Sequence, residues 1–209
     1  MSDTNILVLA KEPVPGRVKT RLCPYFTPDD AARLAAAALR DTLAVVVRTP
    51  ALRRVLVLDG RPGDWVPPGV EVLPQSAGSL DERIADAFER MSGPTILIGM
   101  DTPQVTSRQL RVRWDSHDAW YGGAHDGGFW ALGMREPDPD LVLGVPMSTA
   151  TTGALQLDRL RSAGLRVGHL PTLRDIDTAE CAAYVADQAP HTEFARLHAR
   201  LVGAERDVG

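Results

Sequence analysis

The stretch AKEPVPGRVKTRL, residues 10–22, decides how the rest of the chain is interpreted. It directly follows the apolar run ILVL at residues 6–9, which has the length and composition of a buried strand. Its charged residues are one acid, Glu12, and four bases, Lys11, Arg17, Lys19 and Arg21. Two prolines and Gly16 exclude a helix and hold the backbone open, so N–H groups and basic side chains can converge on one anion. We therefore predict a polyphosphate-binding loop; the alternative is an ordinary surface turn with solvated basic side chains.

The composition is that of a soluble globular protein. The 209 residues are 44% hydrophobic and 24% charged, which suffices for one full core, so we expect a single domain over residues 1–209. A net charge of −4 without a sustained basic run argues against nucleic acid or an anionic membrane as the main partner. Cys23 and Cys181 lack the spacing of a zinc site or a disulfide framework. Neither a signal peptide nor a run of about 20 apolar residues is present, so we expect a cytoplasmic protein.

Two helix starts are marked in the first half of the chain. Thr27 followed by Pro28 is typical of an N-cap with proline at the first helical position. The apolar face of this helix is predicted to be formed by Ala31, Ala35, Leu39, Leu43 and Val46. In QSAGSLDER, Ser79 predicts the start of a second helix.

Strand-like runs alternate with these helices. Apolar runs at residues 54–59, 70–73 and 95–99 predict further strands after the first one. Alternation of this kind favours a three-layer α/β/α, Rossmann-like domain with a mostly parallel, mixed central sheet. We expect its core at about residues 5–185 and a C-terminal helix at residues 190–203.

Two aspartates follow predicted strands, where parallel sheets bind their ligands. Asp101 lies in GMDTPQV, between a glycine that permits close backbone approach and a proline that blocks the strand. The alternative is that Asp101 caps a turn. Asp126 lies in the glycine-rich GGAHDGGFWALG, whose lack of side chains indicates that a ligand can approach the backbone closely. The alternative there is a type I′ turn at Asp126 and Gly127 between two strands.

The last third of the chain carries two more acids. Ser148 and the threonines after it predict the start of a helix. Asp175 and Asp177 follow in LRDIDTAE, where Asp177 and Glu180 also have the spacing of a capping box for the next helix. Near the C-terminus, either internal packing or a homodimer contact is expected of Phe194, Leu197 and Leu201.

Six segments, in this order, carry a resemblance to a known family: AKEPVPGRVKTRL, QSAGSLDER, IGMDTP, GGAHDGGFWALG, VPMSTAT and LRDIDTAE. Together they resemble the DUF2064 family, the selenodomain-associated transferase 1 group of the nucleotide-diphospho-sugar transferase (GT-A) superfamily. The sequence is similar, more distantly, to the guanylyltransferase of coenzyme F420 synthesis and to molybdenum cofactor guanylyltransferases. The resemblance covers residues 6–184 and implies a GT-A fold.

The resemblance implies roles for individual residues. The residues implied to bind the nucleotide are Ala10, Lys11, Gly16, Lys19, Arg21, Gln75, Gly78, Ser79 and Leu80. The residues implied to act in catalysis are Lys19, Arg21, Asp101 and Asp126. Asp101 corresponds to the metal-binding acid of the superfamily and Asp177 to a second ligand, and carboxylate oxygens suit Mg²⁺ or Mn²⁺.

The implied reaction is nucleotidyl transfer from a nucleoside triphosphate to a phosphorylated small-molecule acceptor, with release of pyrophosphate. One alternative is a glycosyltransferase with a nucleoside diphosphate sugar as donor, and another is a nucleotide-binding module without turnover. The chain departs from the commoner family pattern at Gly123 and Phe129, where relatives carry a proline and a tyrosine. This departure falls on the acceptor side of the expected cleft.

Overall fold

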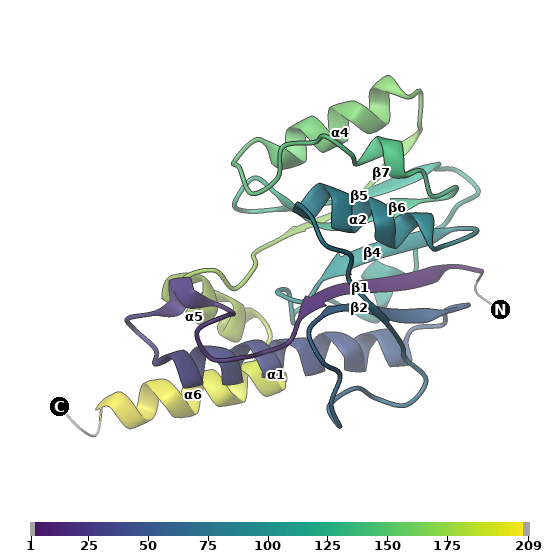
Figure 1. Ribbon diagram of the computed structural model, residues 1–209. Helices are drawn as coiled ribbons and strands as arrows, with labels where there is room; N and C mark the ends of the chain where they lie inside the picture. Colours follow the sequence, from purple (N-terminus) through teal and green to yellow (C-terminus); the bar gives the residue numbers. More distant parts are fainter. Residues whose placement is uncertain (1–2, 207–209) are drawn as a thin grey trace.

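The computed structural model describes residues 3–206 and contains a seven-stranded sheet (Figure 1). The strands are β1 (Asn5–Lys11), β2 (Arg54–Asp59), β3 (Glu71–Pro74), β4 (Thr95–Gly99), β5 (Ala119–Ala124), β6 (Phe129–Met134) and β7 (Val167–Leu173). Their order is β3-β2-β1-β4-β6-β5-β7, and only β6 runs antiparallel to its neighbours among the described strands. This mostly parallel, mixed sheet confirms the predicted fold class. Residues 1–2 and 207–209 of the predicted domain lie outside the described residues.

Helices cover both faces of the sheet (Figure 1). They are α1 (Pro28–Arg48), α2 (Leu80–Glu89), α3 (Ser107–Leu110), α4 (Thr152–Ser162), α5 (Ala179–Gln188) and α6 (Glu193–Arg206), with the 3-10 turns η1 (Thr20–Leu22) and η2 (Pro139–Leu141). Neighbours on β1 point to opposite faces, so Val8 packs with Leu39 of α1 while Leu7 packs with Phe88 of α2. All four side chains are fully buried, which places the core on both sides of the sheet. Within residues 3–206 no helix is long and apolar enough to cross a membrane.

Helix α1 is buried on two sides. It begins as the sequence predicts, because Thr27 Oγ1 accepts a hydrogen bond of 3.1 Å from the Asp30 N–H and proline stands in the first turn. One face of α1 packs on the sheet, and the other, which includes Leu34, packs against α5 and α6. Phe194 and Leu197 of α6 belong to this second cluster, so the apolar stripe of the C-terminal helix is used in internal packing. The two predicted C-terminal helices thus pack on the outside of α1, beyond the three predicted layers (Figure 1).

Two helix starts near the strand ends are set by threonines. Helix α4 begins after Thr151, one of the threonines predicted to start it, while Ser148 lies three residues earlier with a left-handed φ of 59° and does not cap it. Helix α5 begins after Thr178, whose Oγ1 accepts a hydrogen bond of 3.2 Å from the Cys181 N–H. The capping role considered for Asp177 is therefore wrong. The helix begins one residue later than a cap at Asp177 would require, so the side chain in the N-cap position is that of Thr178.

Candidate active site

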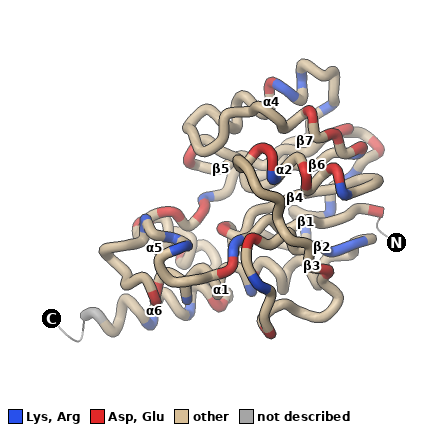
Figure 2. The backbone as a smooth tube through the Cα atoms, viewed as in Figure 1, with Lys and Arg blue, Asp and Glu red and all other residues tan. Residues whose placement is uncertain are grey.

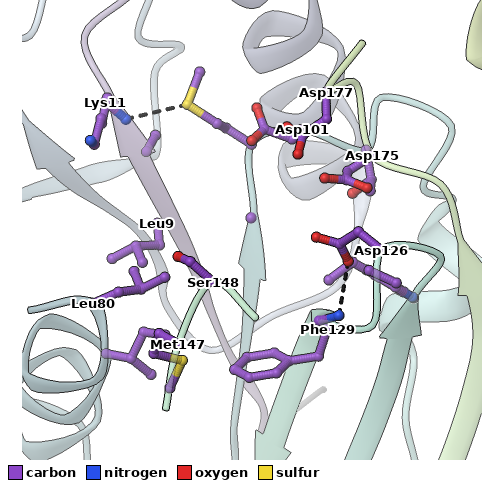
Figure 3. Close-up of a pocket in the computed structure, with 18 of the residues that line it drawn as sticks. Leu9, Lys11, Leu80, Asp101, Asp126, Phe129, Met147, Ser148, Asp175 and Asp177 are labelled. Carbon is purple, nitrogen blue, oxygen red and sulfur yellow. Dashed lines mark hydrogen bonds between the residues drawn. The ribbon is translucent and has the colours of Figure 1, made fainter. Parts of the chain in front are cut away.

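A cleft of about 510 Å³ lies at the carboxyl ends of β1 and β4, as expected for a parallel sheet (Figure 3). It is walled on its other sides by the start of β6 and by the segments after β5 and β7. The predicted site residues that line it are Ala10, Lys11, Lys19, Arg21, Gln75, Leu80, Asp101, Asp126 and Asp177. Gly16, Gly78 and Ser79 were predicted with them but do not line this cleft.

Lys19 lies at the centre of the charged part of the cleft. Its backbone has a left-handed φ of 49°, which is uncommon for a residue with a side chain, and its side chain is only 8% exposed. The Nζ atom lies 2.9 Å from Asp101 Oδ2 and 3.3 Å from Asp177 Oδ1. Burial acts to lower the pKa of Lys19, but the charges of the two carboxylates outweigh it and leave the pKa raised. Lys19 therefore remains an ammonium ion between two acids.

The segment after β7 is tied to the end of β4. The Ile176 N–H donates to the Asp101 carbonyl at 3.1 Å, and Gln104 Nε2 donates to the Arg174 carbonyl at 2.6 Å. Arg21 adds a more exposed ion pair, with its Nη1 3.0 Å from Asp177 Oδ2. The basic loop predicted from residues 10–22 thus meets the acids of two separate strand ends.

Four carboxylates gather at this end of the cleft (Figure 3). One oxygen each of Asp126, Asp175 and Asp177 lies within 4.8 Å of the others. Burial, followed by the charges of Asp177 and Asp126, raises the pKa of Asp175 to about 6. Asp101 Oδ1 is buried and has no hydrogen-bond partner among the described residues. The close group of Asp126, Asp175 and Asp177 fits a hard divalent cation, and the unsatisfied oxygen of Asp101 at the same end of the cleft is a further candidate ligand.

Asp175 was not among the predicted site residues. The sequence shows it only as the first acid of DIDT, and its position beside Asp126 depends on the pairing of β5 with β7. Strands β5 and β7 run parallel, so their carboxyl ends bring residues about fifty positions apart to one place. The DIDT pair was the available signal, but it did not say which acid faces the cleft.

The loop that carries Asp126 is held by close backbone packing. Asp126 Oδ1 accepts a hydrogen bond from the Gly128 N–H at 2.8 Å, and the Gly153 N–H donates to the Gly127 carbonyl at 2.8 Å. Tyr121 donates its hydroxyl to the Gly128 carbonyl at 3.2 Å. A Cβ on Gly153 would stand 2.6 Å from that carbonyl oxygen and closer still to the Tyr121 hydroxyl. The absence of a side chain at Gly153 therefore allows the start of α4 to pack closely against the loop that carries Asp126.

The turn at Asp126 is not the type I′ turn considered from the sequence. That turn needs a positive φ at both central residues, and here Gly127 has φ 90° while Asp126 is not left-handed. The Gly127 N–H donates to the Ala124 carbonyl at 3.1 Å and the Ala124 N–H to the Gly128 carbonyl at 3.0 Å. The loop is thus one residue longer, which leaves Asp126 directed at the cleft (Figure 3).

Part of the predicted nucleotide-binding segment makes hydrogen bonds within the fold. The Ser79 N–H donates to Glu82 Oε2 at 2.7 Å in a capping box, so this N–H is not free for a ligand. Gln75 Nε2 donates to the carbonyls of Ala10 and Val57 at 2.7 and 3.1 Å. These bonds tie the segment between β3 and α2 to β1 and β2. Leu80 remains at the cleft wall.

The other end of the cleft is apolar. Four partly buried side chains face this space in Figure 3: Leu9, Leu80, Phe129 and Met147. They come from β1, α2, β6 and the segment before α4. Only Leu80 was predicted, because no local pattern links side chains from four elements. A cleft with one apolar and one charged end can bind a ligand that has an apolar part and a charged part.

Several solved structures similar to this chain are described as transferases or synthetases. A crystal structure described as that of a "putative nucleotide-diphospho-sugar transferase" from Desulfovibrio desulfuricans G20 is 27% identical, with a TM-score of 0.84 over 99% of this chain and 96% of that chain. CMP:2-keto-3-deoxy-manno-octonic acid synthetase complexed with CTP is 12% identical, with a TM-score of 0.57 over 91% and 98% of the two chains. A cytidylyltransferase from Leptospira borgpetersenii serovar Hardjo-bovis is 13% identical, with a TM-score of 0.53 over 100% and 97%. The last two show the shared fold alone.

The chain therefore shares the fold of these transferases. Residues 31–149 match the family described as "Uncharacterized protein conserved in bacteria (DUF2064)". Since the match spans more than half of the chain, the protein belongs to the DUF2064 family, which confirms the resemblance seen in the sequence. No curated protein matches the chain.

Proposed function

We propose that the protein transfers a nucleotidyl group from a nucleoside triphosphate to a phosphorylated small-molecule acceptor, in a metal-dependent reaction that releases pyrophosphate. One observation carries the proposal. The basic loop after β1 places Lys19 and Arg21 against Asp101 and Asp177, so that cationic side chains and hard oxygen ligands meet in one cleft. In-line transfer at phosphorus needs this combination, because its transition state is stabilised mainly by positive charge.

The cleft offers a place for each part of a nucleotide. The apolar end, lined by Leu9, Leu80 and Met147, suits the base and the sugar, and Lys19 and Arg21 suit the phosphates. Arg can bind two phosphoryl oxygens at once, whereas Lys acts as a compact point charge. In this arrangement the side chains orient the phosphates and offset their charge.

Asp101 and Asp177 are the residues we propose as ligands of a divalent cation, Mg²⁺ or Mn²⁺, with Asp126 and Asp175 close by. The unsatisfied Oδ1 of Asp101 supports this assignment, since a buried carboxylate oxygen seldom lacks a partner. The cation would supply charge neutralisation at the phosphoryl oxygens. Asp126, on the hairpin side of the cleft, then lines the acceptor side.

Glycosyl transfer from a nucleoside diphosphate sugar is the second candidate. The description of the Desulfovibrio desulfuricans relative as a nucleotide-diphospho-sugar transferase favours it, at 27% identity over 99% of this chain. The same cleft would then hold a diphosphate as leaving group. The two reactions differ in their products, because only nucleotidyl transfer releases pyrophosphate.

The products decide between these functions. The purified chain is incubated with Mg²⁺, the four nucleoside triphosphates or a set of nucleoside diphosphate sugars, and a pool of sugar phosphates and other small phosphorylated acceptors. Pyrophosphate released from a triphosphate, and lost in Lys19→Ala and Arg21→Ala, is the expected result. Free nucleoside diphosphate from a sugar donor without pyrophosphate would replace the proposal with glycosyl transfer. Tight nucleotide binding with neither product would favour a binding module.

A further inference from the structure

The Lys19 ammonium lies where Asp101 and Asp177 approach each other. Its Nζ atom contacts one oxygen of each carboxylate, at 2.9 and 3.3 Å, and its side chain is only 8% exposed. Among the described residues, Lys19 is the only base that forms an ion pair with Asp101, whereas Asp177 also pairs with Arg21. The two acids that we propose as metal ligands therefore already share one positive charge from the chain itself.

We propose that Lys19 and a divalent cation compete for the Asp101 and Asp177 carboxylates, so that the cation binds tightly only when phosphate groups take over the Lys19 ammonium. This inference rests on the metal site of the proposed function and adds an order of binding to it. The cation and the phosphates are then expected to bind together, each raising the affinity for the other.

Electrostatics requires the exchange. An ammonium and a divalent cation that both contact one carboxylate stand a few ångströms apart, where like charges repel strongly in a site of low dielectric. The ammonium is held by its ion pairs with Asp101 and Asp177, and the four-carbon stem that carries it is flexible. The backbone of Lys19 is fixed, because its carbonyl accepts the Leu22 N–H at 2.9 Å. The side chain can therefore turn into the cleft while the loop stays in place.

The cleft supplies a destination for the displaced charge. Lys19 lines it together with the bases Lys11, Arg17 and Arg21, whose combined field attracts an anion. A phosphate bound among them would offer Lys19 oxygen acceptors to replace the two carboxylates. Arg21, whose side chain is 74% exposed, keeps only a solvated contact with Asp177 and competes much less with a cation.

The affinity for Mn²⁺ alone, measured by electron paramagnetic resonance of free and bound ion, tests the competition. Lys19→Met keeps the length of the side chain and removes the charge, and it is expected to bind Mn²⁺ at least about tenfold more tightly than the wild-type chain. Lys19→Arg, which keeps the charge, should stay close to wild type. Arg21→Met is the matched control and should tighten binding by less than Lys19→Met. Equal or weaker Mn²⁺ binding by a folded Lys19→Met variant would overturn the proposal.

A second measurement uses the wild-type chain and does not depend on the folding of a variant. Acylation of lysines by an N-hydroxysuccinimide ester, followed by mass spectrometry, reports how accessible the Lys19 amine is. We expect labelling of Lys19 to rise severalfold at saturating Mg²⁺, because the amine leaves its buried position. Unchanged or reduced labelling of Lys19 would contradict the competition.

Asp101→Asn separates failure of this inference from failure of the proposed function. If wild-type Mn²⁺ binding is lost in Asp101→Asn but Lys19→Met does not tighten it, the metal site stands and only the competition is refuted. If Mn²⁺ binds equally to the wild type, Asp101→Asn and Lys19→Met, the metal site itself is refuted and the competition with it.

Discussion

Strands β5 and β7 carry charged residues at both ends, and the two ends differ in how those charges are balanced. Before the strands, Asp118 accepts hydrogen bonds from Arg166 Nε and Nη2 at 2.8 and 2.9 Å, and Arg135 lies 3.7 Å away. These arginines hold the pKa of Asp118 well below its usual range. After the strands, Asp126 and Asp175 stand close to Asp177, and the pKa of Asp175 is raised to about 6.

The difference lies in the supply of positive charge. At the first end the charge of one acid, Asp118, is balanced by two arginines of the same chain. This ion-pair cluster is also open to solvent. At the second end four acids gather, and among the described residues only the buried Lys19 and the exposed Arg21 form ion pairs with them. Such imbalance costs stability, and proteins tolerate it where a ligand restores the balance. The cleft end is therefore the end at which we place function.

Removal of an acid at the cleft end should have the largest effect. Asp101→Asn is expected to lower the Mg²⁺-dependent rate of product release by roughly 10²–10³-fold, as loss of one electrostatic group at a reacting phosphate does. Thermal unfolding followed by circular dichroism should show that the variant remains folded. Asp118→Asn, at the end of β5 that faces away from the cleft, is the control and should keep the wild-type rate. A rate unchanged in Asp101→Asn would remove this acid from the site.

The position of Asp126 should depend on the glycine that lets α4 approach its loop. Gly153→Ala places a Cβ 2.6 Å from the Gly128 carbonyl oxygen, and overpacking of this kind typically costs about 1–3 kcal/mol. We expect this loss in chemical denaturation, together with weaker Mn²⁺ binding. Gly203→Ala in α6 is the matched control, because nothing lies within 4 Å of its added Cβ. Gain of stability in both variants would show that the contact is not tight.

The neighbours Thr178 and Asp177 should separate a helix cap from a ligand. Thr178→Ala removes the hydroxyl that accepts the Cys181 N–H, and the loss of such a cap costs about 1 kcal/mol. Its Mn²⁺ affinity should stay at the wild-type value. Asp177→Asn should show the reverse pattern, with unfolding free energy nearly unchanged and Mn²⁺ affinity reduced. Calorimetric titration and urea unfolding on both variants give the comparison, and a shared pattern would refute the division of roles.

Much of the fold could be predicted because its signals are local. Thr27 and Pro28 mark the start of α1 at the observed position, and the strand at Thr95–Gly99 was predicted with its observed bounds. The presence of Asp101 after that strand follows from the same local pattern. Helix boundaries are less certain by one or two residues, which is why Asp177 was considered as the cap that Thr178 provides.

The site was harder to predict because it depends on contacts distant in sequence. Lys19 and Asp177 are 158 positions apart, and no pattern in either segment shows that they pair. Basic residues in the first loop were predicted to face phosphate, while the structure places Lys19 between two acids. The apolar end of the cleft was missed for the same reason, since Phe129 and Met147 meet only after β6 and α4 are in place.

The smallest effect is expected at the balanced end of the strands, where pH offers a further control. Asp118→Asn should lower the melting temperature slightly at pH 7, because exposed ion pairs contribute little even when their geometry is good. The folded-state pKa of Asp118 is depressed, so its contribution is present above the unfolded pKa of about 3.9 and is lost as the pH falls through the folded value. The difference in melting temperature between Asp118→Asn and wild type should therefore be constant from pH 7 to 5 and shrink below pH 4 or so. Melting curves recorded across this range check the sign. A difference in melting temperature that grows on acidification would mean that Asp118 is not held ionised by Arg166. The claim that the charge is balanced at this end of β5 and β7 would then be refuted.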